Sequence, residues 1–181
     1  LGPSKRWHMF LSHIWGTGQD QCATIKRQLC LLMPGVSIFL DVDDLKDIGA
    51  LEEYVDQSQV IMIFVSKGYF KSGNCLREVK CTVAKQKPIT LVHDPARGGA
   101  SLDAIRDDEC PAELRGAVFD GREVIEWHRI KDFQLVSLKL LAEQLLLGLP
   151  AYKAERALPL YRMMVPVCEC VRRHRSEVLA R

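Results

Sequence analysis

The sequence predicts an α/β domain in which a doubly wound, five-stranded parallel sheet carries helices on both faces. Residues 60–65 form an almost unbroken apolar run rich in β-branched side chains, which is typical of a strand buried on both faces. Strand-like and helix-like patterns also alternate along the chain, as a parallel sheet requires. The chain has 181 residues, of which 48% are hydrophobic, and this is enough for one domain with a sizeable core.

The first third of the chain predicts two strands joined by a helix. The aromatic and apolar run at 7–12 is the first expected strand, and residues 13–21 are expected to form a loop. Gly16 and Gly18 in that loop lack the third glycine of a dinucleotide-binding fingerprint. A helix is predicted next, because apolar residues recur at helical intervals at Cys22, Ile25, Leu29 and Leu32. Pro34 and Gly35 are expected to end it.

An acidic segment follows the second expected strand, residues 36–40. Its four carboxylates, which could suggest a divalent-cation site, belong to Asp41, Asp43, Asp44 and Asp47. The central glycine and the terminal glutamate of an EF-hand are missing, so a solvated loop is the favoured interpretation. Apolar residues at 51–55 then predict a short helix.

The central strand at 60–65 is expected to end at Ser66, Lys67 and Gly68. A helix is expected to follow, with turn and cap residues at 72–74. Its apolar side chains recur at helical spacing, at Leu76, Val79 and Val83. Glu78 lies in the first turns of that helix. The positions three and four residues away hold no basic partner, and no N-cap residue lies three positions before it, so neither a helical ion pair nor a capping box explains it. A solvated carboxylate, or one paired with a distant residue in the tertiary structure, remains an alternative to a functional one.

The second half predicts the remaining strands and the last helix. Residues 88–94 and 123–130 are the fourth and fifth expected strands, and 95–111 form a polar stretch between them. A helix is expected over 135–145, before Gly148 and Pro150. This order of elements predicts the flavodoxin-like type of doubly wound sheet, with right-handed connections.

Charge and cysteine content narrow the class of protein. The net charge is +2 with both signs interspersed, which argues against nucleic acid as a partner. The seven cysteines are an odd number and several lie in apolar patterns, so we expect reduced thiols and a cytoplasmic location. The pair Cys168 and Cys170 lacks the partners of a zinc site, and we expect no metal.

No apolar run approaches the roughly 20 residues that span a bilayer, so we expect no membrane span. Residues 1–4 lack an initiating methionine and are interpreted as a cloning remnant, which predicts a piece of a larger, intracellular protein. Residues 150–181 are interpreted as a partly helical C-terminal extension. Because their basic patch at 172–175 is short, a packing helix is favoured over membrane-surface binding.

Six ordered motifs resemble those of a TIR (Toll/interleukin-1 receptor) domain over residues 5–149. They are FLSH at 10–13, IFLDVDDL at 38–45, FVSKGYF at 64–70, NCLREV at 74–79, PITLVHD at 88–94 and EWHRI at 126–130. The resemblance implies a flavodoxin-like fold. It also implies one of two functions, because some TIR domains hydrolyse NAD+ to nicotinamide and a linear or cyclic ADP-ribose product, whereas others are scaffolds for homotypic TIR–TIR signalling interactions.

The resemblance assigns roles to particular residues. Glu78 matches the catalytic glutamate of a W-C-x-x-E motif, with Cys75 on its cysteine and Asn74 where tryptophan is common. His13, Ile14 and Trp15 occupy a position where many relatives have an arginine. We therefore expect Glu78 to be catalytic, NAD+ to be the substrate with no further cofactor, and five residues to bind it, namely Ser12, His13, Ile14, Trp15 and Asn74.

Residues 41–49 match the BB loop of TIR domains, through which relatives contact each other. The resemblance implies self-association through Asp43, Asp44, Leu45, Lys46 and Gly49. Other TIR domains would then be the partners, in an immune or cell-death signalling response.

Cleavage of the nicotinamide bond passes through an oxocarbenium-like cation that one carboxylate can stabilise. We favour NAD+ hydrolysis over the adaptor alternative, and a phospho-receiver is disfavoured because His13 replaces its acidic pair.

Overall fold

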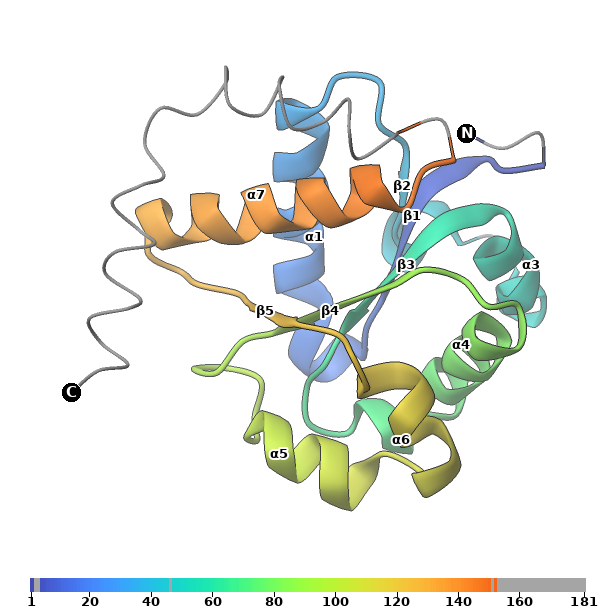
Figure 1. The fold of residues 1–181 in the computed structure, drawn as a ribbon, viewed down its shortest axis with the longest axis vertical. Helices are drawn as coiled ribbons and strands as arrows, with labels where there is room; N and C mark the ends of the chain where they lie inside the picture. Colours follow the sequence, from blue (N-terminus) through green and yellow to red (C-terminus); the bar gives the residue numbers. More distant parts are fainter. Residues whose placement is uncertain (2–3, 46, 151, 153–181) are drawn as a thin grey trace. The chain divides into compact units, whose positions relative to one another are not determined.

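The computed structural model describes residue 1, residues 4–45, residues 47–150 and residue 152. Five parallel strands form one sheet in the order β2-β1-β3-β4-β5 (Figure 1). The strands are β1 (Trp7–Ser12), β2 (Ile38–Phe39), β3 (Ser58–Phe64), β4 (Ile89–His93) and β5 (Val124–Glu126). The longer helices are α1 (Trp15–Leu32), α3 (Leu51–Asp56), α4 (Gly73–Ala84), α6 (Ala112–Phe119) and α7 (Lys131–Leu147). Short turns of helix are α2 (Asp41–Asp44), η1 (Ile48–Ala50), η2 (Tyr69–Lys71), α5 (Leu102–Ala104) and η3 (Ile105–Glu109).

The sheet is doubly wound about β1, which pairs in parallel with β2 on one side and β3 on the other. Met9 therefore lies opposite both Ile38 and Val60. The strand order is that of the flavodoxin-like fold, so the predicted fold class is confirmed. Ligands of such sheets bind beyond the carboxyl ends of the strands where the winding changes direction, which is here the end of β1 and β3.

Two apolar cores cover the two faces of the sheet. One packs α1 and α7 against Met9, Val60 and Phe64, and the other packs α3, α4 and α6 against Phe10 and Ile61. Figure 1 shows these two groups of helices on opposite sides of the strands. Alternate residues of β3 enter alternate cores, which confirms a strand buried on both faces.

The loop predicted at 13–21 is wrong, because α1 begins at Trp15. The helix tolerates Gly18 because its first turns lie directly on the sheet: a Cβ at Gly18 would be 3.1 Å from both His13 Cβ and Phe64 Cδ1. The glycine therefore permits close packing of helix on strand, where the sequence suggested a break.

Other boundaries also differ from the prediction. The second and fifth strands are shorter than expected, and the acidic segment predicted as loop contains the single turn α2. Helix α6 was not predicted, since its apolar pattern is short and contains Gly116. Of its side chains, only Leu114, Val118 and Phe119 are buried.

Within the described residues, no helix has the length and apolar character that crossing a membrane requires. Three predictions concern residues outside the described part, namely the helical extension after residue 152, the Cys168 and Cys170 pair, and the basic patch at 172–175.

Candidate functional site

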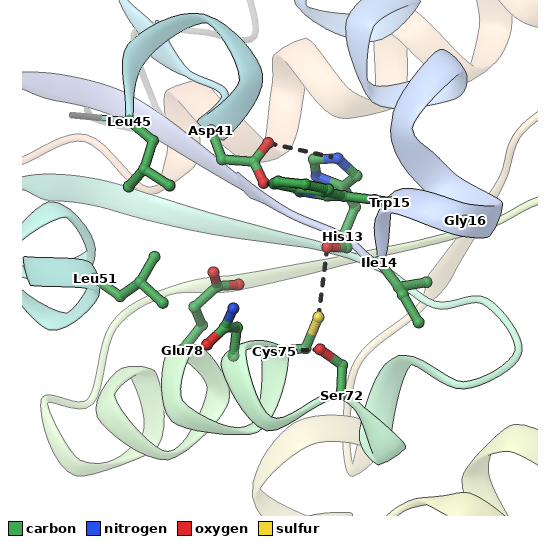
Figure 2. A pocket seen from close by; sticks show the side chains of 11 residues that line it. His13, Ile14, Trp15, Gly16, Asp41, Leu45, Leu51, Ser72, Cys75 and Glu78 are labelled. Atoms are coloured by element: carbon green, nitrogen blue, oxygen red, sulfur yellow. Dashed lines mark hydrogen bonds and ion pairs between the residues drawn. The ribbon is translucent and has the colours of Figure 1, made fainter. Parts of the chain in front are cut away.

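A pocket of about 340 Å³ opens beyond the carboxyl ends of the strands, where residues following β1, β2 and β3 meet (Figure 2). The volume is at the lower end of the range for ligand pockets, about 300–1,000 Å³, so the pocket can enclose part of a dinucleotide. Its lining residues are His13, Ile14, Trp15, Gly16, Asp41, Leu45, Leu51, Ser72, Asn74, Cys75 and Glu78.

Helix α4 places Glu78 in the pocket wall. Ser72 is the N-cap, and its hydroxyl accepts a hydrogen bond from the Cys75 backbone N–H at 3.4 Å. Cys75, Glu78 and Thr82 then follow at helical spacing on the buried face of α4. Only 6% of the Glu78 surface is exposed, so the solvated interpretation of this glutamate is wrong.

A chain of buried hydroxyl groups ends on the Glu78 carboxyl group. Ser12 Oγ donates a hydrogen bond to Glu78 Oε2 at 2.5 Å. Ser12 Oγ also shares a short hydrogen bond with the Tyr69 hydroxyl group. Since a serine hydroxyl has one proton, Tyr69 donates to Ser12 while Ser12 donates to Glu78. Glu78 is therefore held by donors from β1 and η2 in addition to its own helix.

Burial raises the pKa of Glu78 from its ordinary value of 4.5 to about 8. The hydrogen bond from Ser12 opposes this change, whereas the negative charge of Asp41 adds to it. Near pH 7 the carboxyl group is therefore mostly protonated. Perturbed carboxyl groups of this kind in a pocket are candidates for functional sites.

The thiol of Cys75 is not activated as a nucleophile. Burial raises the pKa of its thiol to about 12, and the thiol donates to the His13 carbonyl oxygen at 3.4 Å. A thiol in this state is inert, so Cys75 contributes packing and shape to the pocket.

Trp15 and Asp41 form the outer wall of the pocket. The Trp15 indole N–H donates to Asp41 Oδ2, and the residue is 60% exposed. Asp41 Oδ1 lies 3.6 Å from His13 Nε2, and the His13 ring is buried. Figure 2 shows the Asp41 carboxylate beside the His13 and Trp15 rings, and this one carboxylate contacts both aromatic side chains. The indole thus presents an accessible face at the pocket.

The structure brings most of the predicted ligand contacts together, since His13, Ile14, Trp15 and Asn74 line the pocket with Glu78. Ser12 is not among the lining residues; its hydroxyl group contacts Glu78.

The residues predicted for self-association have different neighbours, because one lines the pocket and two contact α1. Leu45 lines the pocket, whereas Asp43 and Asp44 lie 3.0 and 2.6 Å from the Lys26 ammonium group of α1. The backbone N–H of Gly49 donates to Asp47, and Lys46 lies outside the described residues. The two acidic side chains are therefore engaged within the domain.

Sequence reasoning missed Gly16, Asp41, Leu51 and Ser72 as pocket residues. Asp41 could have been found, since it directly follows β2 and the carboxyl ends of parallel strands share one edge. Leu51 carried no such signal, because an apolar residue that begins a helix resembles any core position.

Among the described lining residues, none is Lys or Arg, while two, Asp41 and Glu78, have carboxyl groups. The described part of the chain holds no group of three or more His, Cys, Asp or Glu side chains arranged for a metal ion. The pocket chemistry therefore suits a cationic or neutral aromatic group better than a phosphate.

No protein family model matches the chain, and no curated protein matches it. Several solved structures do match the chain. A metazoan TIR-STING receptor from C. gigas, in complex with 2′,3′-cGAMP, matches with a TM-score of 0.57 and 14% identity over 80% of this chain. The match covers 41% of that receptor, so this chain spans less than half of its length.

The TIR domain of the Toll-related Receptor TRR-2 from Hydra magnipapillata matches with a TM-score of 0.52 and 12% identity, over 77% of this chain and 98% of that domain. At these identities the likeness establishes the fold. The chain therefore has the fold of a TIR domain.

Proposed function

We propose that this chain belongs to the NAD+-cleaving class of TIR domains, which release nicotinamide and ADP-ribose or a cyclic ADP-ribose product in signalling or an immune or cell-death response. The observation that carries the proposal is the Glu78 carboxyl group, which is buried in a pocket wall beyond the third strand. This is the place that the family resemblance gives to the catalytic glutamate.

The reaction requires stabilisation of positive charge at the ribose. As the bond from nicotinamide to ribose breaks, the sugar gains oxocarbenium character, and a carboxylate close to it lowers the energy of the transition state. Nicotinamide leaves as a neutral molecule, so no second acid is required. The Glu78 carboxylate would supply the negative charge, and Ser12 would orient it through the hydrogen bond to Oε2.

The pocket accommodates the nicotinamide riboside half of the substrate. The exposed face of Trp15 offers stacking to a pyridinium ring, which is a cation before cleavage. Asn74 provides an amide that can pair with the carboxamide or a ribose hydroxyl. Because the described lining lacks basic side chains, the pyrophosphate lies outside the pocket.

Self-association is the second part of the proposal. The segment from Asp41 to Gly49 contributes Asp41 and Leu45 to the pocket, so a second copy that contacts this segment would also order the site. The partners that we infer are NAD+ and further TIR domains in a homo-oligomer, with the reaction occurring in the cytoplasm.

Incubation of the purified protein with NAD+, followed by chromatography for nicotinamide, tests the proposal. We expect nicotinamide release whose specific activity rises with protein concentration. Glu78→Gln should lower turnover about a hundred- to a thousandfold, while Glu143→Gln, the same change on a half-buried position of α7, should leave it unchanged. Absence of turnover at every concentration would favour the adaptor alternative.

A further inference from the structure

We propose that Glu78 carries a proton when no ligand is bound, that a cationic aromatic ligand binds beside it by displacing this proton, and that Ser12 and Tyr69 are positioning residues whose hydrogen bonds favour the ionised form. The inference rests on the proposed function for its choice of ligand class, a pyridinium. It adds that recognition of the positive charge and loss of one proton are coupled.

The geometry of the hydroxyl chain carries the first step. Tyr69 is fully buried and Ser12 is 1% exposed, so water does not replace either hydrogen bond. The chain ends on Oε2 at 2.5 Å, and the described structure gives Glu78 Oε1 no hydrogen-bond donor of its own. One oxygen is therefore anchored, and Figure 2 shows the carboxyl group on the pocket side of α4.

Within the described residues, no ion pair is formed by Glu78. The positive charge of Arg77, its neighbour on α4, lowers the pKa of Glu78, but Arg77 is itself bound by Glu52 through two hydrogen bonds of 2.8 and 2.7 Å. The other titratable or charged groups around Glu78 are Asp41 of α2, Glu52 of α3, Tyr69 of η2, Cys75 of α4 and the buried ring of His13. Two of these are carboxylates, and burial keeps the Tyr69 phenol and the Cys75 thiol protonated.

A buried carboxylate without a counter-ion is unfavourable, and the group takes up a proton instead. A pyridinium ring beside Glu78 supplies the missing positive charge. The O–H bond of Glu78 then breaks, the proton passes to the solvent buffer, and the carboxylate remains as the partner of the cation. No other bond changes.

The donors Ser12 and Tyr69 act on this equilibrium in a known direction. Hydrogen bonds to the charged form of a carboxyl group favour ionisation. Loss of the Ser12 hydroxyl therefore makes the proton harder to remove and weakens cation binding near neutral pH. Loss of the Tyr69 hydroxyl has the same sign and a smaller size, because Tyr69 acts through Ser12.

The test measures binding of 1-methylnicotinamide, a pyridinium cation without a ribose bond to cleave, and of nicotinamide, its neutral counterpart, by NMR titration from pH 6 to 10. We expect the dissociation constant of the cation to fall about tenfold per pH unit below pH 8 and to level off above it. The affinity for nicotinamide should not increase with pH. Calorimetry in two buffers of different ionisation enthalpy should show about one proton released per bound cation at pH 7.

Three variants separate positioning from folding. In Ser12→Ala, and to a smaller extent in Tyr69→Phe, the levelling-off should move to higher pH. In Glu78→Gln the pH dependence should disappear. Ser137→Ala removes a similarly buried hydroxyl on the other face of the sheet and should leave the profile unchanged.

The inference is overturned if 1-methylnicotinamide does not bind at 50 mM, binds with a pH-independent affinity, or shows the wild-type pH profile in folded Ser12→Ala and Tyr69→Phe. These outcomes are independent of turnover. A protein that binds the cation with the expected pH profile but leaves NAD+ intact would refute the hydrolase and retain the proton-linked site.

Discussion

Replacement of Glu78 by glutamine should stabilise the folded protein near neutral pH while it removes most of the turnover. The side chain is 6% exposed, and its pKa is raised from 4.5 to about 8 mainly by burial. The folded protein therefore keeps the Glu78 proton at pH values where the unfolded chain has lost it. The contribution of this group to stability is fully present below pH 4.5 and is lost as the pH rises to about 8.

The size of the effect follows from the two pKa values. One pH unit between them corresponds to about 1.4 kcal/mol, so the whole interval from 4.5 to about 8 amounts to about 5 kcal/mol. Between pH 5.5 and 7.0 the wild-type protein should lose about 2 kcal/mol through Glu78 alone. Glutamine does not titrate, and its amide oxygen can still accept the hydrogen bond from Ser12.

Urea unfolding followed by circular dichroism, at pH 5.5 and 7.0 with a reductant present, measures this effect. The free energy of unfolding of Glu78→Gln minus that of the wild type should increase by about 2 kcal/mol between the two pH values. Glu143→Gln on α7 is the control and should show no such increase. A difference that is constant with pH, or that decreases, would show that Glu78 does not retain a proton in the folded state.

Three further substitutions test the fold and the pocket. Gly98→Ala should cost about 1–3 kcal/mol of stability in the same urea assay, because the new Cβ would lie 2.7 Å from the Asp94 carbonyl oxygen; a smaller loss would mean that this turn relaxes. Trp15→Ala should weaken substrate binding by about 1–3 kcal/mol, and an unchanged KM in the folded variant would remove the stacking role. Lys26→Met should lower stability by about 0.5–1 kcal/mol, since Lys26 contacts Asp43 and Asp44. If that variant is as stable as the wild type, α1 does not hold the acidic segment.

Local patterns in the sequence were sufficient for the sheet and for one catalytic candidate. The apolar run at 60–65 predicted a strand buried on both faces, and β3 has this property, because alternate side chains enter opposite cores. Ser72 was predicted among the cap residues, and its hydroxyl group caps α4. Glu78 was singled out because its helical neighbours offered no partner. Each of these inferences depends on residues within about four positions of one another, where spacing and capping act.

The boundaries that were wrong depend on contacts between distant residues. Gly16 and Gly18 resembled a loop, yet α1 includes both, since the lack of a side chain at Gly18 lets the helix lie against His13 and Phe64. The spacing of residues along the chain contains no information on how closely a helix approaches a sheet.

The chemical state of the candidate site also depends on distant residues. Ser12 and Glu78 are 66 positions apart, and Ser12 and Tyr69 are 57 apart, yet they form one buried hydrogen-bond chain. The pKa of Glu78 follows from this burial and from Asp41 of another element. The sequence identifies the carboxyl group, but folding brings the donors, the second carboxylate and the exclusion of water to it, because desolvation and charge interactions act through space.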